Sequence, residues 1–127
     1  MHDTTEGGTL GCVFEMSLAS GLGFELVEDS IPVDQSTNAV CKALSVDPLR
    51  LLGSGSLVIS CGEKDRENVI KAVEKEGVKC TLIGKFLPKK KGRKLLRAHG
   101  NKSEQIDDYV QDEIWTSLRK YGNLSRN

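Results

Sequence analysis

The chain has 127 residues, and its 18 Lys and Arg balance 18 Asp and Glu, so its formal net charge is zero. This length is near the usual size of one domain and can bury a sizeable core. A neutral chain has no overall attraction to nucleic acid or anionic lipid. No apolar run is long enough to cross a bilayer, and the polar amino terminus does not resemble a signal peptide. We therefore expect a cytoplasmic protein with no nucleic-acid or membrane partner.

The first predicted element is a helix that follows a polar, glycine-rich opening segment. Residues 2–8 (HDTTEGG) cannot form a stable helix interior, but the apolar residues after them recur at spacings of three and four until Gly21. A half-buried strand is predicted at Gly23–Val27, because apolar and acidic residues alternate there.

Two helical segments are predicted before the second strand. Asp34 is a suitable cap for a helix that runs through Leu44. Asp47 and Pro48 begin a short helical turn, since Asp caps well and Pro suits the first helical position. Residues 53–55 (GSG) end this turn.

A buried strand is predicted at Ser56–Cys61 (SLVISC), because the run is apolar and rich in β-branched residues. An amphipathic helix is expected from Lys64 to Glu76, where Gly77 suits a left-handed carboxy-terminal cap.

The remaining chain predicts a hairpin and a closing helix. Alternating apolar residues indicate a strand over 78–86, which residues 88–92 turn into a partner strand at 93–98. A long amphipathic helix is predicted over 103–121, because apolar residues recur every fourth position there. The repeating residues are Ile106, Val110, Ile114 and Leu118. This order of elements favours helices layered on one sheet, as in α/β or α+β proteins, but does not fix the strand order.

No metal site is predicted from the cysteines and histidines. The cysteines are irregularly spaced, without a C-x-x-C motif or a His at ligand spacing, so we interpret them as small buried hydrophobic residues. His2 and His99 give no metal-binding pair either. The cysteines are Cys12, Cys41, Cys61 and Cys80.

The opening loop is the first candidate ligand site. The free amides and dipole at the amino end of the first helix favour an anion, and Gly7 and Gly8 allow close backbone approach. Asp3 could hold magnesium, and His2 could donate to an oxyanion. The alternative is that Asp3 and Thr5 only cap the helix and the glycines only shape a turn.

A second candidate is the flexible loop of Gly53, Ser54 and Gly55, which could reach a ligand at the edge of a strand or be an ordinary turn.

The basic run Lys89–Lys94 lies at a predicted hairpin tip without interleaved aromatic residues, which favours a solvated turn over a nucleic-acid contact.

No nucleophile and base can be paired from the sequence. Glu15 and Glu28 are the other polar residues of interest, and neither has a partner at a spacing that implies acid and base roles.

The opening segment and later motifs resemble a known family. Residues 2–8 are similar to the H-D-P-T-R-G-G stretch that opens the carboxy-terminal domain of the hydrogenase maturation factor HypE branch of the aminoimidazole ribonucleotide synthetase (AIR synthase-related) superfamily. Ordered matches with similar gaps continue to about residue 97. They are Glu15, Ala19-Ser20-Gly21, Gly23, Glu25, Ile31-Pro32-Val33, Cys41, Leu44, Asp47-Pro48-Leu49, Gly53 to Leu57 and Ile83-Gly84.

The resemblance implies an α+β fold like the carboxy-terminal domain of AIR synthase (PurM), with three α/β/α layers, a mixed sheet and a partly ferredoxin-like topology. Residues 1–100 would form the family domain, and 101–127 a helical extension packed on it. An amino-terminal domain, which this chain lacks, would supply most magnesium ligands and build a homodimer. The chain would then be an expressed fragment or a natural split protein that is not catalytic alone.

Members of the family use ATP to phosphorylate or dehydrate a C=O or similar oxygen. The resemblance therefore implies ATP and magnesium as cofactors of the full-length protein, with none expected to be bound to this chain alone. The chain would close one side of the ATP-phosphate cleft through residues of the two loops. These residues are His2, Asp3, Thr5, Gly7, Gly8, Gly53, Ser54 and Gly55.

Two departures from the family pattern stand out. Thr4 and Glu6 occupy the positions of the family's Pro and Arg, so a cation that could contact phosphate is replaced by an anion. The family's terminal cysteine, which carries a carbamoyl group, has no counterpart in the closing residues 124–127. The alternative interpretation is a stand-alone small-ligand-binding or regulatory module without enzymatic activity.

Overall fold

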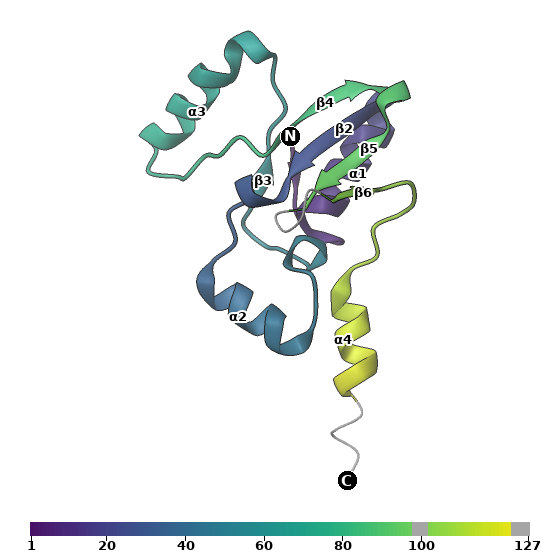
Figure 1. Cartoon of the computed structure of the whole chain (residues 1–127). Coiled ribbons are helices and arrows are strands. Elements are labelled where there is room, and N and C mark those ends of the chain that lie inside the picture. The colour runs from purple at the N-terminus through teal and green to yellow at the C-terminus, as the bar shows by residue number, and fades with distance from the viewer. Residues whose placement is uncertain (98–101, 123–127) are drawn as a thin grey trace.

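The computed structural model describes residues 1–97 and 102–122 (Figure 1). Helix α1 (Gly8–Ser20) packs on a four-stranded mixed sheet with the strand order β4-β2-β5-β6. The mixed α+β fold predicted from the sequence is therefore confirmed. The strands of this sheet are β2 (Leu22–Val27), β4 (Gly84–Pro88), β5 (Arg93–Leu96) and β6 (Ser103–Gln105).

The predicted hairpin between the strands at 78–86 and 93–98 is wrong, because β4 and β5 do not pair with each other and β2 lies between them. Strand β2 runs antiparallel to β4 and parallel to β5, and β6 pairs antiparallel with β5 at the edge. The core lies between α1 and this sheet, where Phe14, Phe24 and Leu95 are buried. A second, two-stranded antiparallel sheet joins β1 (His2–Asp3) to β3 (Leu57–Val58) beside the amino end of α1.

The predicted helix boundaries are largely confirmed. Helix α1 ends at Gly21, whose φ of 68° is the left-handed conformation that glycine adopts readily. Asp34 caps α2 (Gln35–Leu44) by accepting a hydrogen bond from the Ser36 N–H at 2.8 Å. Asp47 does the same for the short 3₁₀ turn η2 (Pro48–Arg50).

Helix α3 (Arg66–Lys75) follows a 3₁₀ turn, and it ends just before the left-handed Gly77, as predicted. Helix α4 (Glu113–Tyr121) is the last described element. None of the helices in the described ranges has both the length and the apolar character needed to cross a membrane.

Two predicted strands are shorter than the sequence pattern suggested. The strand predicted at Ser56–Cys61 is limited to β3, because β3 pairs with the two-residue strand β1 and not with the larger sheet. Leu57 is accordingly 55% exposed, so the prediction of a buried strand is wrong. The strand predicted over 78–86 begins only at Gly84, where pairing with β2 begins.

The prediction of one helix over 103–121 is also wrong. This segment begins as strand β6, continues without regular structure, and becomes helical only at Glu113. Ile106 and Val110 are buried in the core, and the Ile106 N–H donates to the Arg93 carbonyl at 2.9 Å. The backbone of residues 103–106 therefore forms hydrogen bonds with the sheet, although the apolar spacing predicted a helix there.

The cysteine prediction holds for two of four residues. Cys12 and Cys41 are buried, and burial raises the pKa of the Cys12 thiol to about 11. Cys61 is exposed and Cys80 is partly exposed, so the prediction that all four are buried is wrong, because the segments that flank α3 do not enter the core. His99, the end of the strand predicted at 93–98 and the closing residues 124–127 lie outside the described residues.

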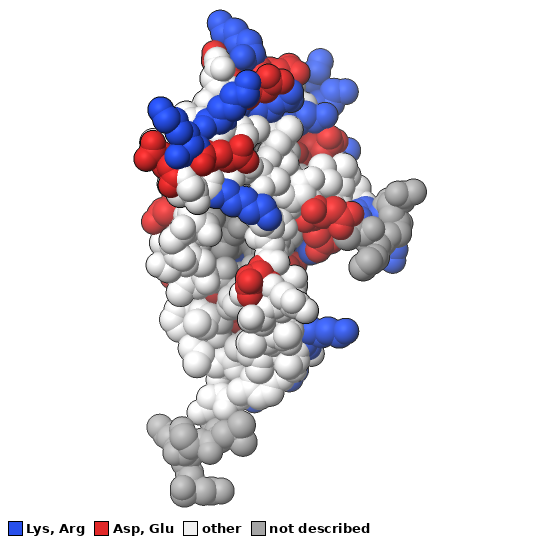
Figure 2. All heavy atoms as spheres, turned by 90° about the vertical axis from the view of Figure 1, so that its left-hand side faces the viewer, with Lys and Arg blue, Asp and Glu red and all other residues white. Residues whose placement is uncertain are grey.

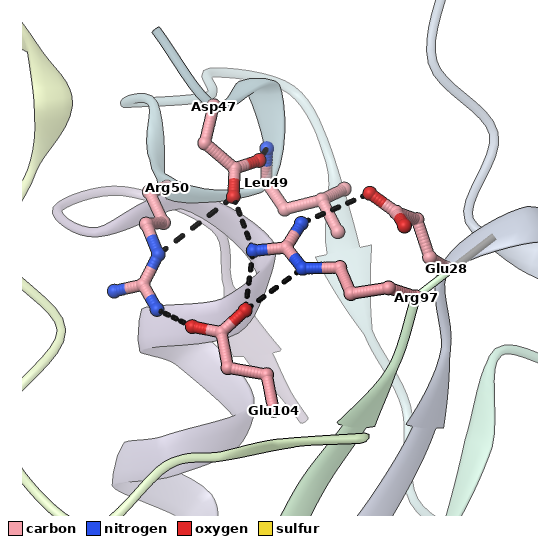
Figure 3. Close-up of polar contacts among 6 residues, drawn as sticks. All are labelled: Glu28, Asp47, Leu49, Arg50, Arg97 and Glu104. Carbon is pink, nitrogen blue, oxygen red and sulfur yellow. Dashed lines mark hydrogen bonds and ion pairs between the residues drawn. The ribbon is translucent and has the colours of Figure 1, made fainter. Parts of the chain in front are cut away.

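An ion-pair network fixes η2 to the edge of the sheet (Figure 3). The guanidinium of Arg97 lies 2.9 Å from Glu28, 2.7 Å from Asp47 and 2.6 Å from Glu104. Arg50 also binds Glu104 at 2.5 Å. Burial by itself would lower the pKa of Arg97, but its hydrogen bonds to the three carboxylates raise the pKa above its usual value. Because Asp47 also caps η2, this network sets the position of the turn.

Replacing Arg97 with Met should destabilise the fold, because three partly buried carboxylates lose their shared cation while the apolar stem is kept. We expect a loss of about 1–3 kcal/mol in the free energy of unfolding. Urea denaturation with an unchanged m-value would measure it.

The matched control is Lys85→Met, which removes an ion pair to Glu25 whose lysine side chain is 64% exposed. Exposed pairs contribute only about 0–1 kcal/mol. Equal losses in the two variants would contradict a positioning role for the network.

Candidate functional site

The structure brings the two predicted loops together. Strands β1 and β3 pair, so that Asp3 lies opposite Leu57. Just beyond this pairing, the Gly53 N–H donates to the Thr4 carbonyl at 2.9 Å, and the Thr4 hydroxyl donates to the Gly53 carbonyl at 3.2 Å. Thr4 is buried, so this two-way contact is protected from water. Segments that are about fifty residues apart in the sequence thus form one surface, here called the paired-loop surface and defined by residues 2–5 and 53–56.

The predicted site residues divide into exposed and packed groups. Asp3, Thr5, Ser54 and Gly55 are exposed, and the side chain of Asp3 is 64% exposed. Gly53 is partly exposed beside Thr4. These groups could contact a ligand from solvent, because they lie on the outer side of the paired loops.

Gly7 and Gly8 are buried and pack against backbone. A Cβ on Gly8 would lie 2.7 Å from the Leu49 carbonyl oxygen and 2.6 Å from that of Leu51. A Cβ on Gly7 would lie 2.7 Å from the Val110 carbonyl oxygen. Both glycines also have positive φ angles, of 71° and 62°. They allow two other segments to approach the amino end of α1, which is a packing role.

Asp112, which the sequence pattern did not indicate as a site residue, lies at the same helix end. The Gly7 N–H donates to one oxygen of the Asp112 carboxylate at 2.8 Å, and the other oxygen accepts from the Ile114 N–H at 2.8 Å. Asp112 is only 2% exposed. Its cap on α4 follows from a familiar signal, an Asp directly before a helix with an acidic first turn, but that signal was hidden by the predicted longer helix.

His2 is held between two carboxylates. Its Nε2 lies 2.7 Å from Glu15, and its Nδ1 lies 3.1 Å from Asp3. Burial tends to lower the pKa of His2, but the hydrogen bonds to Glu15 and then Asp3 outweigh this effect and raise the pKa above 6.5. Glu15 thus orients the imidazole, a role that its isolated position in the sequence did not indicate.

A separate hollow lies elsewhere on the molecule. It has a volume of about 640 Å³ and is lined mainly by apolar residues of β2, β4 and residues 58–63, and no predicted site residue lines it. In the space-filling view of the face that bears α3, basic and acidic side chains are intermixed (Figure 2). Within residues 1–97 and 102–122, no cluster of three or more His, Cys, Asp or Glu could hold a metal ion.

Comparison with known proteins identifies the family. Residues 1–96 match the family described as "AIR synthase related protein, C-terminal domain". The chain belongs to this family. The AIR synthase-related match ends with β5, so β6, Asp112 and α4 lie beyond it.

Relatives of this AIR synthase-related domain are named HypE. Carbamoyl dehydratase HypE of Escherichia coli K12 is 34% identical over 104 residues, which are 80% of this chain and 31% of that protein. HypE of Azotobacter vinelandii is 33% identical over 86 residues, which are 66% of this chain and 25% of that protein. The chain thus spans a quarter to a third of the length of these relatives.

Solved structures agree with this relationship. A crystal structure of E. coli HypE, a hydrogenase maturation protein, has a TM-score of 0.75 and 29% identity over 87% of this chain and 34% of that chain. A crystal structure of a HypE–HypF complex has a TM-score of 0.73 and 25% identity over 83% of this chain and 34% of that chain. The resemblance inferred from the sequence motifs is confirmed.

Gly8→Ala tests the packing at the amino end of α1. The added methyl group would meet two carbonyl oxygens, so we expect about 1–3 kcal/mol of destabilisation beyond the cost of the left-handed backbone. Gly21→Ala is the matched control, because Gly21 has a similar φ of 68° at the other end of α1 and no atom within 4 Å of the place that a Cβ would take. Chemical denaturation measures the free energy of unfolding of both variants. Equal losses of stability in the two would contradict the close packing at Gly8.

Glu15→Gln tests the clamp on His2. Because the pKa of folded His2 is raised, protonated His2 stabilises the fold below pH 6.5, and this contribution is lost as the pH rises through the folded pKa. The melting temperature of the variant should fall below that of the wild type at acidic pH, and the gap should close in alkaline buffer.

Calorimetry from acidic to alkaline pH measures this difference in melting temperature. Glu25→Gln, which removes a carboxylate paired with Lys85, is the control. A gap that stays constant or widens with increasing pH would argue against the clamp.

Proposed function

We propose that this chain is the carboxy-terminal domain of a HypE-like, ATP-dependent enzyme of hydrogenase maturation, and that its paired-loop surface forms one wall of the ATP-phosphate cleft. One observation carries the proposal. The two-way contact between Thr4 and Gly53 holds residues 2–5 against residues 53–56, in a chain that belongs to the AIR synthase-related family.

The exposed groups of this surface fit a metal-bound phosphate. The carboxylate of Asp3 could bind magnesium, and the hydroxyls of Thr5 and Ser54 could donate to phosphate oxygens. The Gly7 amide is already used by Asp112, so it is not part of the proposed contact. Bound ATP would supply the phosphoryl group, and these residues would orient its phosphates.

The charge of the proposed wall favours phosphate that is bound through a metal ion. The paired-loop surface itself contains no Lys or Arg, whereas Asp3, Glu6 and Glu15 lie in or beside the opening loop. Bare phosphate would be repelled by these carboxylates, and a magnesium ion between them would reverse that repulsion. This also accounts for the acidic Glu6 at the position where HypE has Arg.

The rest of the active site would come from an amino-terminal domain. Phosphoryl transfer depends on metal ions and positioning groups from several elements, and relatives are three to four times as long as the matched region. We propose that this domain completes the cleft and forms the homodimer, and that the assembled protein acts in the cytoplasm. The chain alone is then expected not to hydrolyse ATP.

Nuclear magnetic resonance of the chain tests the proposed wall. Titration with magnesium and inorganic pyrophosphate should shift amide signals of residues 2–5 and 53–56, with a dissociation constant on the order of 1 mM, because one wall gives only part of the contacts. Asp3→Ala should remove the magnesium-dependent part, while Asp34→Ala, at the exposed cap of α2, should not.

Two other outcomes would reject this role. Shifts confined to other regions, or none, would mean that the paired-loop surface does not face phosphates. Micromolar binding with a large rise in melting temperature would instead support a stand-alone ligand-binding module, since a complete site stabilises the folded state by mass action.

A further inference from the structure

Asp112 reaches the opening loop from outside the family-matched region. Its buried carboxylate accepts one hydrogen bond from the amino end of α1 and one from the amino end of α4. We propose that Asp112 is a positioning residue for the paired-loop surface, since it fixes Gly7 and thereby the exposed Thr5. This inference rests on the proposed function.

Asp112 is itself held firmly by the body of the protein. The Ile106 N–H donates to the Arg93 carbonyl, and Val110 is buried in the core at 2% exposure. The Val110 carbonyl oxygen abuts Gly7, where only the absence of a Cβ leaves room. The carboxylate therefore reaches Gly7 from a fixed backbone and is not carried by a free side chain on the surface.

The loop is anchored on both sides of its exposed part. Thr4 is held by its hydrogen bonds to Gly53 and by its N–H, which donates to the Ser56 carbonyl at 3.3 Å. Gly7 is held by Asp112. Only Thr5 and Glu6 lie between these anchors, so their backbone has little freedom. A loop fixed before binding loses less conformational entropy when a ligand docks, which raises affinity.

The contact needs both oxygens of a carboxylate. A carboxylate can accept at each oxygen, so it serves Gly7 and Ile114 together. An asparagine has one acceptor oxygen and would leave one of the two amides without its bond. A buried amide without an acceptor is costly, so the loop or α4 would rearrange.

The test repeats the titration with magnesium and pyrophosphate on Asp112→Asn. We expect the dissociation constant measured at residues 2–5 to rise roughly tenfold, the cost of one lost buried hydrogen bond, and hydrogen exchange of the Gly7 amide to accelerate. Both proteins are compared at a temperature where each is folded, because a residue that only stabilises the fold would lower the melting temperature without changing the affinity.

Asp34→Asn is the matched control, because Asp34 caps one exposed helix by the same chemistry and its carboxylate accepts from backbone N–H groups of that same helix. The Asp34→Asn variant should bind magnesium and pyrophosphate with the same affinity as the wild type. Asp112→Ser is the second variant, since a serine hydroxyl can still cap α4 while it removes the acceptor for Gly7. It should weaken binding to a similar extent even if the Asn variant does not fold.

The outcomes separate this inference from the proposed function. Wild-type shifts at residues 2–5 with an unchanged affinity in the Asp112 variants would overturn the positioning role and leave the proposed wall intact. Absence of those shifts in the wild type would overturn the proposed function, and this inference with it.

Discussion

The amino end of α1 is closed by two backbone segments that leave no space for a side chain. Residues 49–51 pack against Gly8, and residues 110–112 pack against Gly7. The carbonyl oxygens of Leu49, Leu51 and Val110 lie closer to these glycines than a Cβ atom would allow. The buried carboxylate of Asp112 then satisfies the Gly7 amide. An amino end that many proteins leave open to anions is here used for packing, so in our proposal the ligand contacts the exposed residues that this packing holds in place.

This constraint links the ion-pair network to the candidate site. Arg97 and its carboxylate partners fix η2 (Figure 3). Leu49 of η2 and Leu51, the residue that follows η2, lie against Gly8. Strand β6 and the segment after it bring Asp112 to Gly7 from the opposite direction. The paired-loop surface is therefore supported by η2 and by the segment after β6, although its own residues come from two short loops.

The sequence predicted the elements whose signals are local. Caps such as Asp34 and Asp47, the helix end at Gly21 and the alternation in β2 each depend on neighbouring residues. Ile106 and Val110 are buried because they follow the edge strand of the sheet into the core, so their helix-like spacing did not reflect a helix. The pairing of Thr4 with Gly53, and of Arg97 with Asp47, joins residues about fifty positions apart and leaves no pattern in a single sequence. Family motifs marked the two loops but not their contact.

In our proposal, the paired-loop surface faces the phosphates of ATP. A crystal structure of this domain joined to a HypE-type amino-terminal domain, with magnesium and a non-hydrolysable ATP analogue, would show whether it does. We expect phosphate oxygens within hydrogen-bonding distance of Thr5 and Ser54, with magnesium at Asp3. Phosphates bound entirely by the other domain, with this surface turned to bulk solvent, would contradict the account.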